Sequence, residues 1–513
     1  MIWQNPLSDE FTNCCIKLVV DFFTGACAGL RLSSAKPFYP NLFRMPGSLS
    51  TDVQIVSSQV FLLPVELRVP LKFGPETTTR VVCLRTSVEV ADKAGRRAIG
   101  WGETPLSVSW VWPASLSVAD RARRMEAFAV QLAEKLVAFG ASGHPLEISH
   151  DFQKHVLMNE VAIANQLEDS EPMPYLAALV CLSAFDIALH DAYGQLHQRD
   201  IYDLYDKEFF SRDLSHFLEP ESGSSISFKD RHVADFLIRP GVRSMPVWHL
   251  VGGLDALTAE DLNGTEPNDG HPVLLGDWIQ KDGLRCLKVK LRGTDAQWDY
   301  ERMRRIAALG FPMGVRWLSA DFNCTVRDPA YVNDILDKLL RDEPEIYART
   351  LYVEQPFAYE LEHDMLDVRS VSARKPLFLD ESAHDWEFVK LGRSLGWSGV
   401  ALKTCKTQTG ALLSLCWAKA HGMPLMVQDL TNPMLAMLPH VRLASHAGTI
   451  QGVECNAMQF YPDASLPEQA VHPHIYQRRH GMVDISTLGG NGFGYRIEDI
   501  QRQLPAAAAT FAS

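Results

Sequence analysis

The chain has no excess of basic residues. Its 513 residues carry 49 Lys and Arg against 62 Asp and Glu, a formal net charge of −13 at pH 7. Nucleic acids and anionic membranes bind proteins through basic surfaces, so this balance argues against both as partners. The expected partner is a small molecule.

The sequence also lacks a cysteine framework and a long apolar run. Its 10 cysteines are scattered and form no CxxC pair, which favours reduced thiols and a cytoplasmic location. Residues 15–30 resemble a signal sequence only faintly, because Lys17 and Asp21 interrupt the apolar stretch. No uninterrupted apolar run approaches the roughly 18 residues that a membrane-spanning helix needs. With 46% hydrophobic residues, the chain can instead bury a large core.

The stretch CLKVK at residues 286–290 places two lysines on one face of an apolar strand, because Lys288 and Lys290 are two positions apart. An isolated KxK is typical of an edge strand with solvated lysines. Downstream, however, a polar residue ends each of four further apolar runs. These residues are Asp321 in RWLSADFN, Glu354 in LYVEQPF, Asp380 in PLFLDES and Lys403 in GVALKTCK.

The spacing of these residues predicts a repeating unit. Counted from Lys290, successive separations are 31, 33, 26 and 23 residues, about the length of a strand, a helix and two loops. Such repeats favour a closed parallel barrel, in which catalytic residues come from the C-terminal ends of several strands. The five residues would then meet at one mouth. Three carboxylates from consecutive strands form an oxygen-rich site that suits Mg²⁺.

The ordered series KVK, ADFN, VEQP, LDES and LKTCK resembles the enolase superfamily, and within it the muconate-lactonizing-enzyme-like subgroup of the mandelate racemase/muconate lactonizing enzyme family. The resemblance covers residues 52–500. It implies a modified TIM barrel, (β/α)7β, with an α+β capping domain. The organisation expected is an N-terminal extension at 1–51, the cap at 52–200, an insertion at 201–244, the barrel at 245–455 and a C-terminal segment at 456–513 that returns to the cap.

The resemblance also implies roles for the residues. Lys290 and Lys403 match the family's two lysine bases, and Lys288 is a cation that contacts the substrate. The metal ligands implied are Asp321, Glu354 and Asp380, which would hold Mg²⁺, with Mn²⁺ as the alternative ion. The substrate contacts implied are Lys288, Asn323, Asp429 and Glu454.

The function implied is removal of the α-proton of a small carboxylate substrate, through an enediolate that the metal stabilises. Racemisation or epimerisation and cycloisomerisation are favoured. The alternatives are dehydration of an acid sugar, syn elimination of the o-succinylbenzoate synthase type, a different metal-dependent barrel enzyme, and a barrel that only binds. The substrate and any homo-oligomeric state stay open.

Several positions refine this reading. Glu454 and Asn456 depart from the DxD of dipeptide epimerases, which weakens a dipeptide substrate. No histidine occurs in the seventh strand, so two lysines remain as bases. Lys406 matches a structural lysine and is the lesser candidate base, while TQTG at 407–410 replaces the usual glycine pair.

Two cap segments are expected over the barrel mouth, one with Phe73 and one with Trp110 and Trp112. His440 and His446 are expected in packing or surface roles. Residues 503–513, QLPAAAATFAS, are expected to be a disordered tail.

Overall fold

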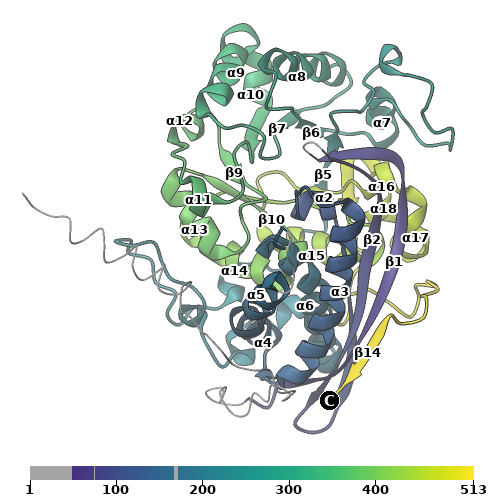
Figure 1. Cartoon of the computed structure of the whole chain (residues 1–513), viewed down its shortest axis with the longest axis vertical. Helices are drawn as coiled ribbons and strands as arrows, with labels where there is room; N and C mark the ends of the chain where they lie inside the picture. Colours follow the sequence, from purple (N-terminus) through teal and green to yellow (C-terminus); the bar gives the residue numbers. More distant parts are fainter. Residues whose placement is uncertain (1–48, 74–75, 167–170) are drawn as a thin grey trace, which may run out of the picture. The chain divides into compact units, whose positions relative to one another are not determined.

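The computed structural model describes residues 49–73, 76–166 and 171–513. Nearly all of the predicted N-terminal extension lies outside these ranges. Within residues 45–513, which form one unit, an antiparallel sheet carries the strand order β14-β1-β2-β3 and a separate sheet of parallel strands closes into a barrel (Figure 1).

The cap is built on a long hairpin. β1 (Val53–Phe73) pairs antiparallel with β2 (Glu76–Asp92), which pairs with β3 (Arg97–Pro105) across the DKAG turn. Buried and exposed residues alternate through much of β1, as expected for a strand with one face on a core. The far end of the β1–β2 hairpin carries Lys72 and Phe73.

Helix α6 (Tyr175–His197) packs directly on β3. Gly102 permits this contact, because a Cβ atom there would lie 2.0 Å from the carbonyl oxygen of Ala184. α6 is the one helix of the described residues that is long and apolar enough to cross a membrane, but 94% of its most apolar window is buried inside the protein. α3 (Val118–Phe139) lies against the same helix and β1. The other helical elements of the cap are α2 (Val108–Val111), α4 (Pro145–Phe152), η1 (Gln153–Leu157) and α5 (Met158–Gln166).

Eight parallel strands form the barrel, and β12 closes it by pairing with β5. This confirms the predicted barrel with an α+β cap. The strands are β5 (Ser244–Val251), β6 (Cys286–Lys290), β7 (Trp317–Asp321), β8 (Thr350–Glu354), β9 (Leu377–Leu379), β10 (Gly399–Leu402), β11 (Leu425–Val427) and β12 (Val453–Glu454). The main connecting helices are α7 (Leu275–Asp282), α8 (Ala296–Gly310), α9 (Pro329–Asp342), α10 (Pro344–Arg349), α11 (Leu361–Asp364), α12 (Arg369–Ser372), α13 (Trp386–Leu395), α14 (Gln408–Ala420) and α15 (Met437–Ala447).

The insertion between the cap and the barrel packs on α14. It contains the short helices η2 (Ile201–Asp203), η3 (Lys207–Phe209), η4 (Leu214–His216) and η5 (Val233–Phe236). The indole of Trp417 on α14 donates to the carbonyl of Glu219 at 2.9 Å, and Lys419 donates to the carbonyl of Phe236 at 2.7 Å. This segment therefore covers one helix of the barrel.

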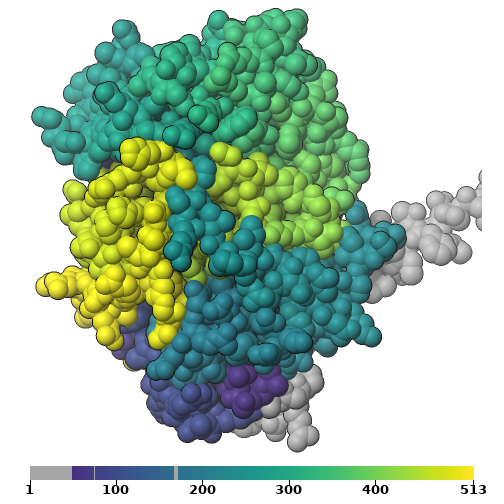
Figure 2. Space-filling model, turned by 180° about the vertical axis from the view of Figure 1, so that it is seen from behind, coloured from purple at the N-terminus to yellow at the C-terminus, as the bar shows by residue number. Residues whose placement is uncertain are grey.

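The C-terminal segment joins both sheets. After α16 (Ala457–Phe460), α17 (Leu466–Val471) and α18 (Pro473–Tyr476), β13 (Met482–Asp484) pairs antiparallel with β5. The expectation of a disordered tail is wrong, because β14 (Ala509–Ala512) pairs with β1 and satisfies part of that strand's edge. Seen from behind, the C-terminal residues (yellow) lie beside early barrel residues (teal) and reach the cap (Figure 2).

Candidate active site

The strand register brings the predicted residues to one end of the barrel. Lys290 on β6 pairs with Asp321 on β7, which pairs with Glu354 on β8. Asp380 and Lys403 directly follow β9 and β10. Because side chains alternate along a strand, these residues face the barrel interior at one level.

Burial is nearly complete at this site. The exposed fractions are 0% for Asp321 and Glu354, 1% for Asp380, 3% for Lys403 and 7% for Lys290. Charges buried to this degree are costly unless they are paired, so the contacts among them decide the arrangement.

Lys288 lies at the centre of the carboxylates. Its ammonium is 2.5 Å from Glu354 Oε1, 3.2 Å from Asp321 Oδ2 and 3.2 Å from Glu454 Oε2. Burial lowers the pKa of Lys288, but the three carboxylates outweigh burial and hold the pKa well above its usual value. The carboxylates around Lys288 thus favour its charged form.

The two predicted bases lie on either side of this cluster. Lys290 forms a short ion pair with Asp321. Burial raises the pKa of the Asp321 carboxyl, but Lys290 and Lys288 more than reverse this and lower it. Across the barrel, Lys403 is 3.2 Å from Asp380 Oδ2 and donates to the carbonyl of Asp429 at 2.9 Å. Its pKa is lowered by burial but raised on balance by Asp380.

Lys406 shares Asp380 with Lys403, because its ammonium lies 3.7 Å from Asp380 Oδ1. Its ammonium donates to the carbonyls of Asp380 and Ala383, the latter at 3.1 Å, so it braces the loop that carries Asp380. Burial and the charge of Lys403 lower the pKa of Lys406. Thr407 beyond it has φ 74°, a left-handed region that favours glycine, and its hydroxyl accepts from Gly410 N at the start of α14. The loop thus keeps a glycine-like conformation without the glycine.

Three carboxylates of this site have the chemistry of metal ligands. As they stand, no three His, Cys, Asp or Glu side chains in the described ranges are grouped to hold a metal ion; Glu354 pairs with Lys288 and Asp380 with Lys403. The donors nevertheless suit Mg²⁺: three buried carboxylates come from neighbouring strands, and no group of the described residues donates a hydrogen bond to Asp380 Oδ1. The residues fit a hard divalent ion.

Gln355 and Gln428 also belong to this site, although no motif pointed to Gln355. Gln355 Oε1 accepts from the Asp380 amide at 2.8 Å and from the Ser382 hydroxyl at 2.8 Å, which fixes the loop after β9. Gln428 Nε2 donates to Glu354 Oε2 at 2.5 Å. Gln428 thus orients the Glu354 carboxylate directly, as partners of metal ligands do, whereas Gln355 positions Asp380 through its backbone.

The cap contributes Phe73 and Trp110 to the site. Together with Lys288, Lys290 and Lys403 they line a small inner cavity of about 20 Å³. The Trp110 ring centroid lies 5.0 Å from the Lys403 ammonium. Trp112 is buried at 2% exposure and does not line this cavity.

Glu381 is a site residue that the sequence reasoning missed. Its Oε1 accepts from the indole N–H of Trp110 and from Asn323 Nδ2, both at 3.0 Å. Burial, followed by Asp380 and Asp321, raises the pKa of Glu381. The available signal was a second acid directly after Asp380 in LDES.

The eighth strand brings Glu454 and Asn456 beside Asp429. Asn456 Nδ2 donates to Glu454 Oε1 at 2.6 Å and to Asp429 Oδ1 at 3.2 Å, while its Oδ1 accepts from Leu250 N at 2.9 Å. Asn456 therefore occupies one oxygen of the Glu454 carboxylate and one of the Asp429 carboxylate. His440 Nε2 bonds to the Glu454 carbonyl at 2.7 Å, and His446 stacks on Tyr202, so both histidines are packing residues.

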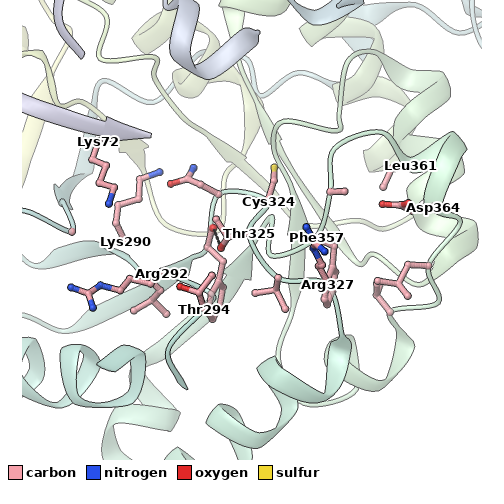
Figure 3. A pocket seen from close by; sticks show the side chains of 18 of the residues that line it. Lys72, Lys290, Arg292, Thr294, Cys324, Thr325, Arg327, Phe357, Leu361 and Asp364 are labelled. Atoms are coloured by element: carbon pink, nitrogen blue, oxygen red, sulfur yellow. Dashed lines mark hydrogen bonds between the residues drawn. The ribbon is translucent and has the colours of Figure 1, made fainter. Parts of the chain in front are cut away.

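A larger outer cavity of about 990 Å³ adjoins the site on the side of β6, β7 and β8 (Figure 3). Lys290 lines both the outer and the inner cavity. The outer cavity thus leads from the buried charges to the surface.

Comparisons with known proteins agree with this architecture. Residues 274–500 match the family model described as "Enolase C-terminal domain-like". The aromatic dipeptide epimerase of Herpetosiphon aurantiacus is 25% identical over 256 residues, which are 48% of this chain and 66% of that protein. The match therefore spans just under two thirds of the relative's length.

Two solved structures share the fold. An enolase superfamily member from Roseovarius nubinhibens, complexed with magnesium, has a TM-score of 0.58 at 18% identity and covers 90% of this chain and 100% of its own. A dipeptide epimerase from Cytophaga hutchinsonii, complexed with Mg and a dipeptide, has a TM-score of 0.54 at 17% identity. The match covers 86% of this chain and 95% of that protein's chain.

The protein is a closed parallel barrel under an α+β cap, with acids and lysines at the ends of its strands, and it shares this fold with the two solved structures. The matching family model covers residues 274–500, less than half of the chain, so the likeness to the enolase superfamily is a likeness of this part of the barrel region.

Proposed function

We propose that the protein moves the α-proton of a carboxylate substrate in a Mg²⁺-dependent racemisation or epimerisation, with Lys290 and Lys403 as the two acid/base groups. The observation that carries this proposal is geometric. The two lysines extend from β6 and β10, and the three predicted metal ligands come from the strands between them. Bases on both sides of one site are what 1,1-proton transfer requires.

Asp321, Glu354 and Asp380 would hold the metal. Bound Mg²⁺ would act as a Lewis acid on the substrate carboxylate. It would also balance the negative charge of the carboxylates that otherwise favour the protonated form of the lysines. Gln355 and Gln428 keep two of these ligands oriented through the contacts described above.

The chain's own residues supply the rest of the chemistry. Lys288, in its charged form, would stabilise the negative charge that develops as the α-proton leaves. Lys290 would take the proton on one face, and Lys403 would return one on the other. Phe73 and Trp110 line the inner cavity and would help to exclude water from it.

The aromatic dipeptide epimerase relative favours epimerisation over the alternatives of cycloisomerisation, dehydration and syn elimination. A dipeptide substrate is less well supported, because Asn456 occupies carboxylate oxygens that could receive an ammonium group.

The test is α-proton exchange in D₂O with a panel of N-acylamino acids, dipeptides and acid sugars. We expect deuterium to enter the α-position of at least one carboxylate when Mg²⁺ is present, and to stop entering when the metal is chelated. Asp321→Asn, Glu354→Gln and Asp380→Asn should each weaken binding of Mn²⁺ followed by electron paramagnetic resonance. Unchanged Mn²⁺ binding in all three variants would contradict the assignment of the ligands.

A further inference from the structure

The β1–β2 hairpin has an irregular segment shortly before its far end. Between Glu66 and Leu71 the register shifts, and four residues of β1 lie opposite one residue of β2. Pro70 lies in this segment and has no N–H group to give to the ladder, which favours such a break. Bulges turn side chains away from the directions of a regular strand. Arg68, in the same segment, reaches the barrel.

Arg68 uses its whole guanidinium in these contacts. Its Nε and Nη2 donate to the two carboxylate oxygens of Asp269, at 2.6 and 2.9 Å. Its Nη1 and Nη2 also donate to three carbonyls, those of Pro272 at 3.2 Å, His271 at 3.3 Å and Gln459 at 3.4 Å. The Arg68 side chain is only 9% exposed. A two-point pair with a carboxylate fixes direction as well as distance.

Asp269 belongs to the long loop between β5 and α7, residues 252–274. The same loop is attached to the body of the barrel. Arg305 on α8 donates to both carboxylate oxygens of Asp261 at 2.8 Å, and Asp261 also accepts from the Leu257 amide at 3.0 Å. The loop is therefore tied to a barrel helix at one point and offers a carboxylate to the cap at another.

Hollow space lies on both sides of Arg68. Cavities of about 760 and 300 Å³ both have Arg68 in their lining, with Asp269 in the lining of the larger and Pro272 in that of the smaller. Atoms that border a cavity lack packing contacts on that side. The polar contacts of Arg68 therefore matter more for attaching this part of the hairpin to the barrel.

The residues just beyond Arg68 reach the candidate active site. Phe73, five positions further along β1, lines the inner cavity together with Lys288 and Lys290. Lys72 lines the outer cavity and is drawn beside Lys290 (Figure 3). A displacement at Arg68 would thus be passed along a short stretch of strand to residues next to a predicted base.

We propose that Arg68 is a positioning residue: its pairing with Asp269 holds the end of the β1–β2 hairpin on the barrel and so keeps Phe73 at the inner cavity. Arg68 lies outside the lining of the inner and outer cavities, so it acts on the site through the hairpin. The part of this inference that concerns substrate binding rests on the proposed function.

The first experiment needs no substrate. Phe73→Cys introduces a thiol at the inner cavity, and tandem mass spectrometry follows its reaction with iodoacetamide separately from the 10 native cysteines. In this background Arg68→Gln and Asp269→Asn should each raise the labelling rate about three- to twentyfold, because labelling follows the fraction of molecules in which the segment is open. The double variant should rise no further than Arg68→Gln alone, since both changes remove one interaction.

The controls separate positioning from a general loss of stability. Arg80→Gln removes an exposed arginine of the same hairpin, whose partner 3.4 Å away is Glu66 of the cap, and should leave labelling unchanged. Arg68→Lys keeps the charge without the planar two-point contact, so its labelling rate should lie between those of the parent and Arg68→Gln. The buried native thiols of Cys83 and Cys286 should keep their slow rates in every variant.

The second experiment measures substrate binding, with a carboxylate that exchanges its α-proton in the panel described above. Arg68→Gln and Asp269→Asn should each raise KM about three- to tenfold and leave kcat within about twofold, because apparent affinity falls with the fraction of molecules that have the hairpin in place. Arg80→Gln should change neither constant.

The outcomes distinguish this inference from the proposed function. Unchanged labelling in both Arg68→Gln and Asp269→Asn would overturn the inference, as would an equal rise in the labelling of Cys83 and Cys286. Faster labelling with an unchanged KM would overturn the positioning role. If no carboxylate exchanges its α-proton, the proposed function fails, and the labelling rates still decide whether Arg68 holds the hairpin.

Discussion

At the scale of single residues, pairing decides what each lysine can do. Lys288 is surrounded by carboxylates, while Lys290 and Lys403 each pair with one metal-ligand candidate. Lys406 also lies 3.7 Å from Asp380 Oδ1 and donates to two backbone carbonyls. Lys403 and Lys406 therefore share Asp380, and variants of the two lysines are needed to separate a base from a bracing lysine.

Removing either predicted base should nearly abolish turnover. Lys290→Ala and Lys403→Ala should each lower kcat by about 10²- to 10⁴-fold, the usual contribution of a general acid or base. Each variant should still exchange the α-proton of one enantiomer, followed by NMR in D₂O, because the base on the other face remains.

Lys406→Ala is the matched comparison for this pair. It should lower thermal stability and retain more activity than Lys403→Ala, since it removes two hydrogen bonds to the Asp380 loop. Full activity in Lys403→Ala together with loss in Lys406→Ala would mean that the bases are assigned to the wrong lysine of LKTCK.

Trp110→Phe should change substrate preference and leave metal affinity intact. The substitution keeps an aromatic ring near Lys403 but removes the N–H that Glu381 accepts. We expect a changed ratio of kcat/KM between two substrates and an unchanged Mn²⁺ dissociation constant. Trp112→Phe, equally buried but outside the cavity lining, is the control. Weaker Mn²⁺ binding in Trp110→Phe would count against a role for Trp110 that is limited to the substrate.

At the scale of elements, the cap is joined to the barrel through α6. Asp186 on α6 accepts from Thr409 N at 3.0 Å and from its hydroxyl at 2.7 Å. On the same helix, His190 contacts Thr409 at 3.0 Å and Tyr205 at 2.9 Å. The start of α14, which follows Lys403 and Lys406, is thus held by the cap, so the position of α6 on its sheet affects the site.

Gly102→Ala should therefore damage both stability and the site. The added Cβ would meet the Ala184 carbonyl oxygen at 2.0 Å and the Ala188 amide nitrogen at 2.7 Å, and these backbone atoms cannot yield as a flexible side chain would. Overpacking usually costs about 1–3 kcal/mol. We expect at least that loss in denaturant unfolding. Gly276→Ala in α7, where the nearest atoms lie 3.9 Å away, should be neutral or slightly stabilising.

At the scale of the whole molecule, burial of titratable groups links folding to pH. Burial lowers the pKa of His190, His440 and His446 to about 4. For each, the unfolded chain binds the proton at a higher pH than the folded chain does. The contribution of each histidine to folding stability is therefore lost as the pH falls from about 6.5 to about 4.

His446→Gln should remove its share of this pH dependence. His446 stacks on Tyr202 with ring centroids 3.9 Å apart, so the variant should be less stable than the parent at pH 7. The difference in unfolding free energy should narrow as the pH falls to 4, by at most about 3 kcal/mol, since one pKa unit corresponds to about 1.4 kcal/mol. Denaturant unfolding at several pH values measures this difference. A difference that stays constant from pH 7 to pH 4 would show that His446 does not titrate as described.

Much of this architecture is encoded locally and could be predicted. The strand and helix periods, the order of Lys290, Asp321, Glu354, Asp380 and Lys403, and the resemblance in their motifs were enough to predict the barrel and its cap. Each of these signals lies within a few residues of the chain, because alternation along a strand and the end of an apolar run are local properties.

Other features depend on contacts between distant segments. Trp110 meets Glu381 from 271 positions away, Arg478 reaches His249, and the alanine-rich tail becomes β14 because the edge of β1 is free to pair. The outer cavity likewise combines Lys72 of the cap with Arg327 of the barrel. Composition and spacing by themselves determined which residues stand at the ends of the strands. Only the tertiary structure decided which charges face each other, because ion pairing and cavity shape depend on distances in space that the order of residues does not specify.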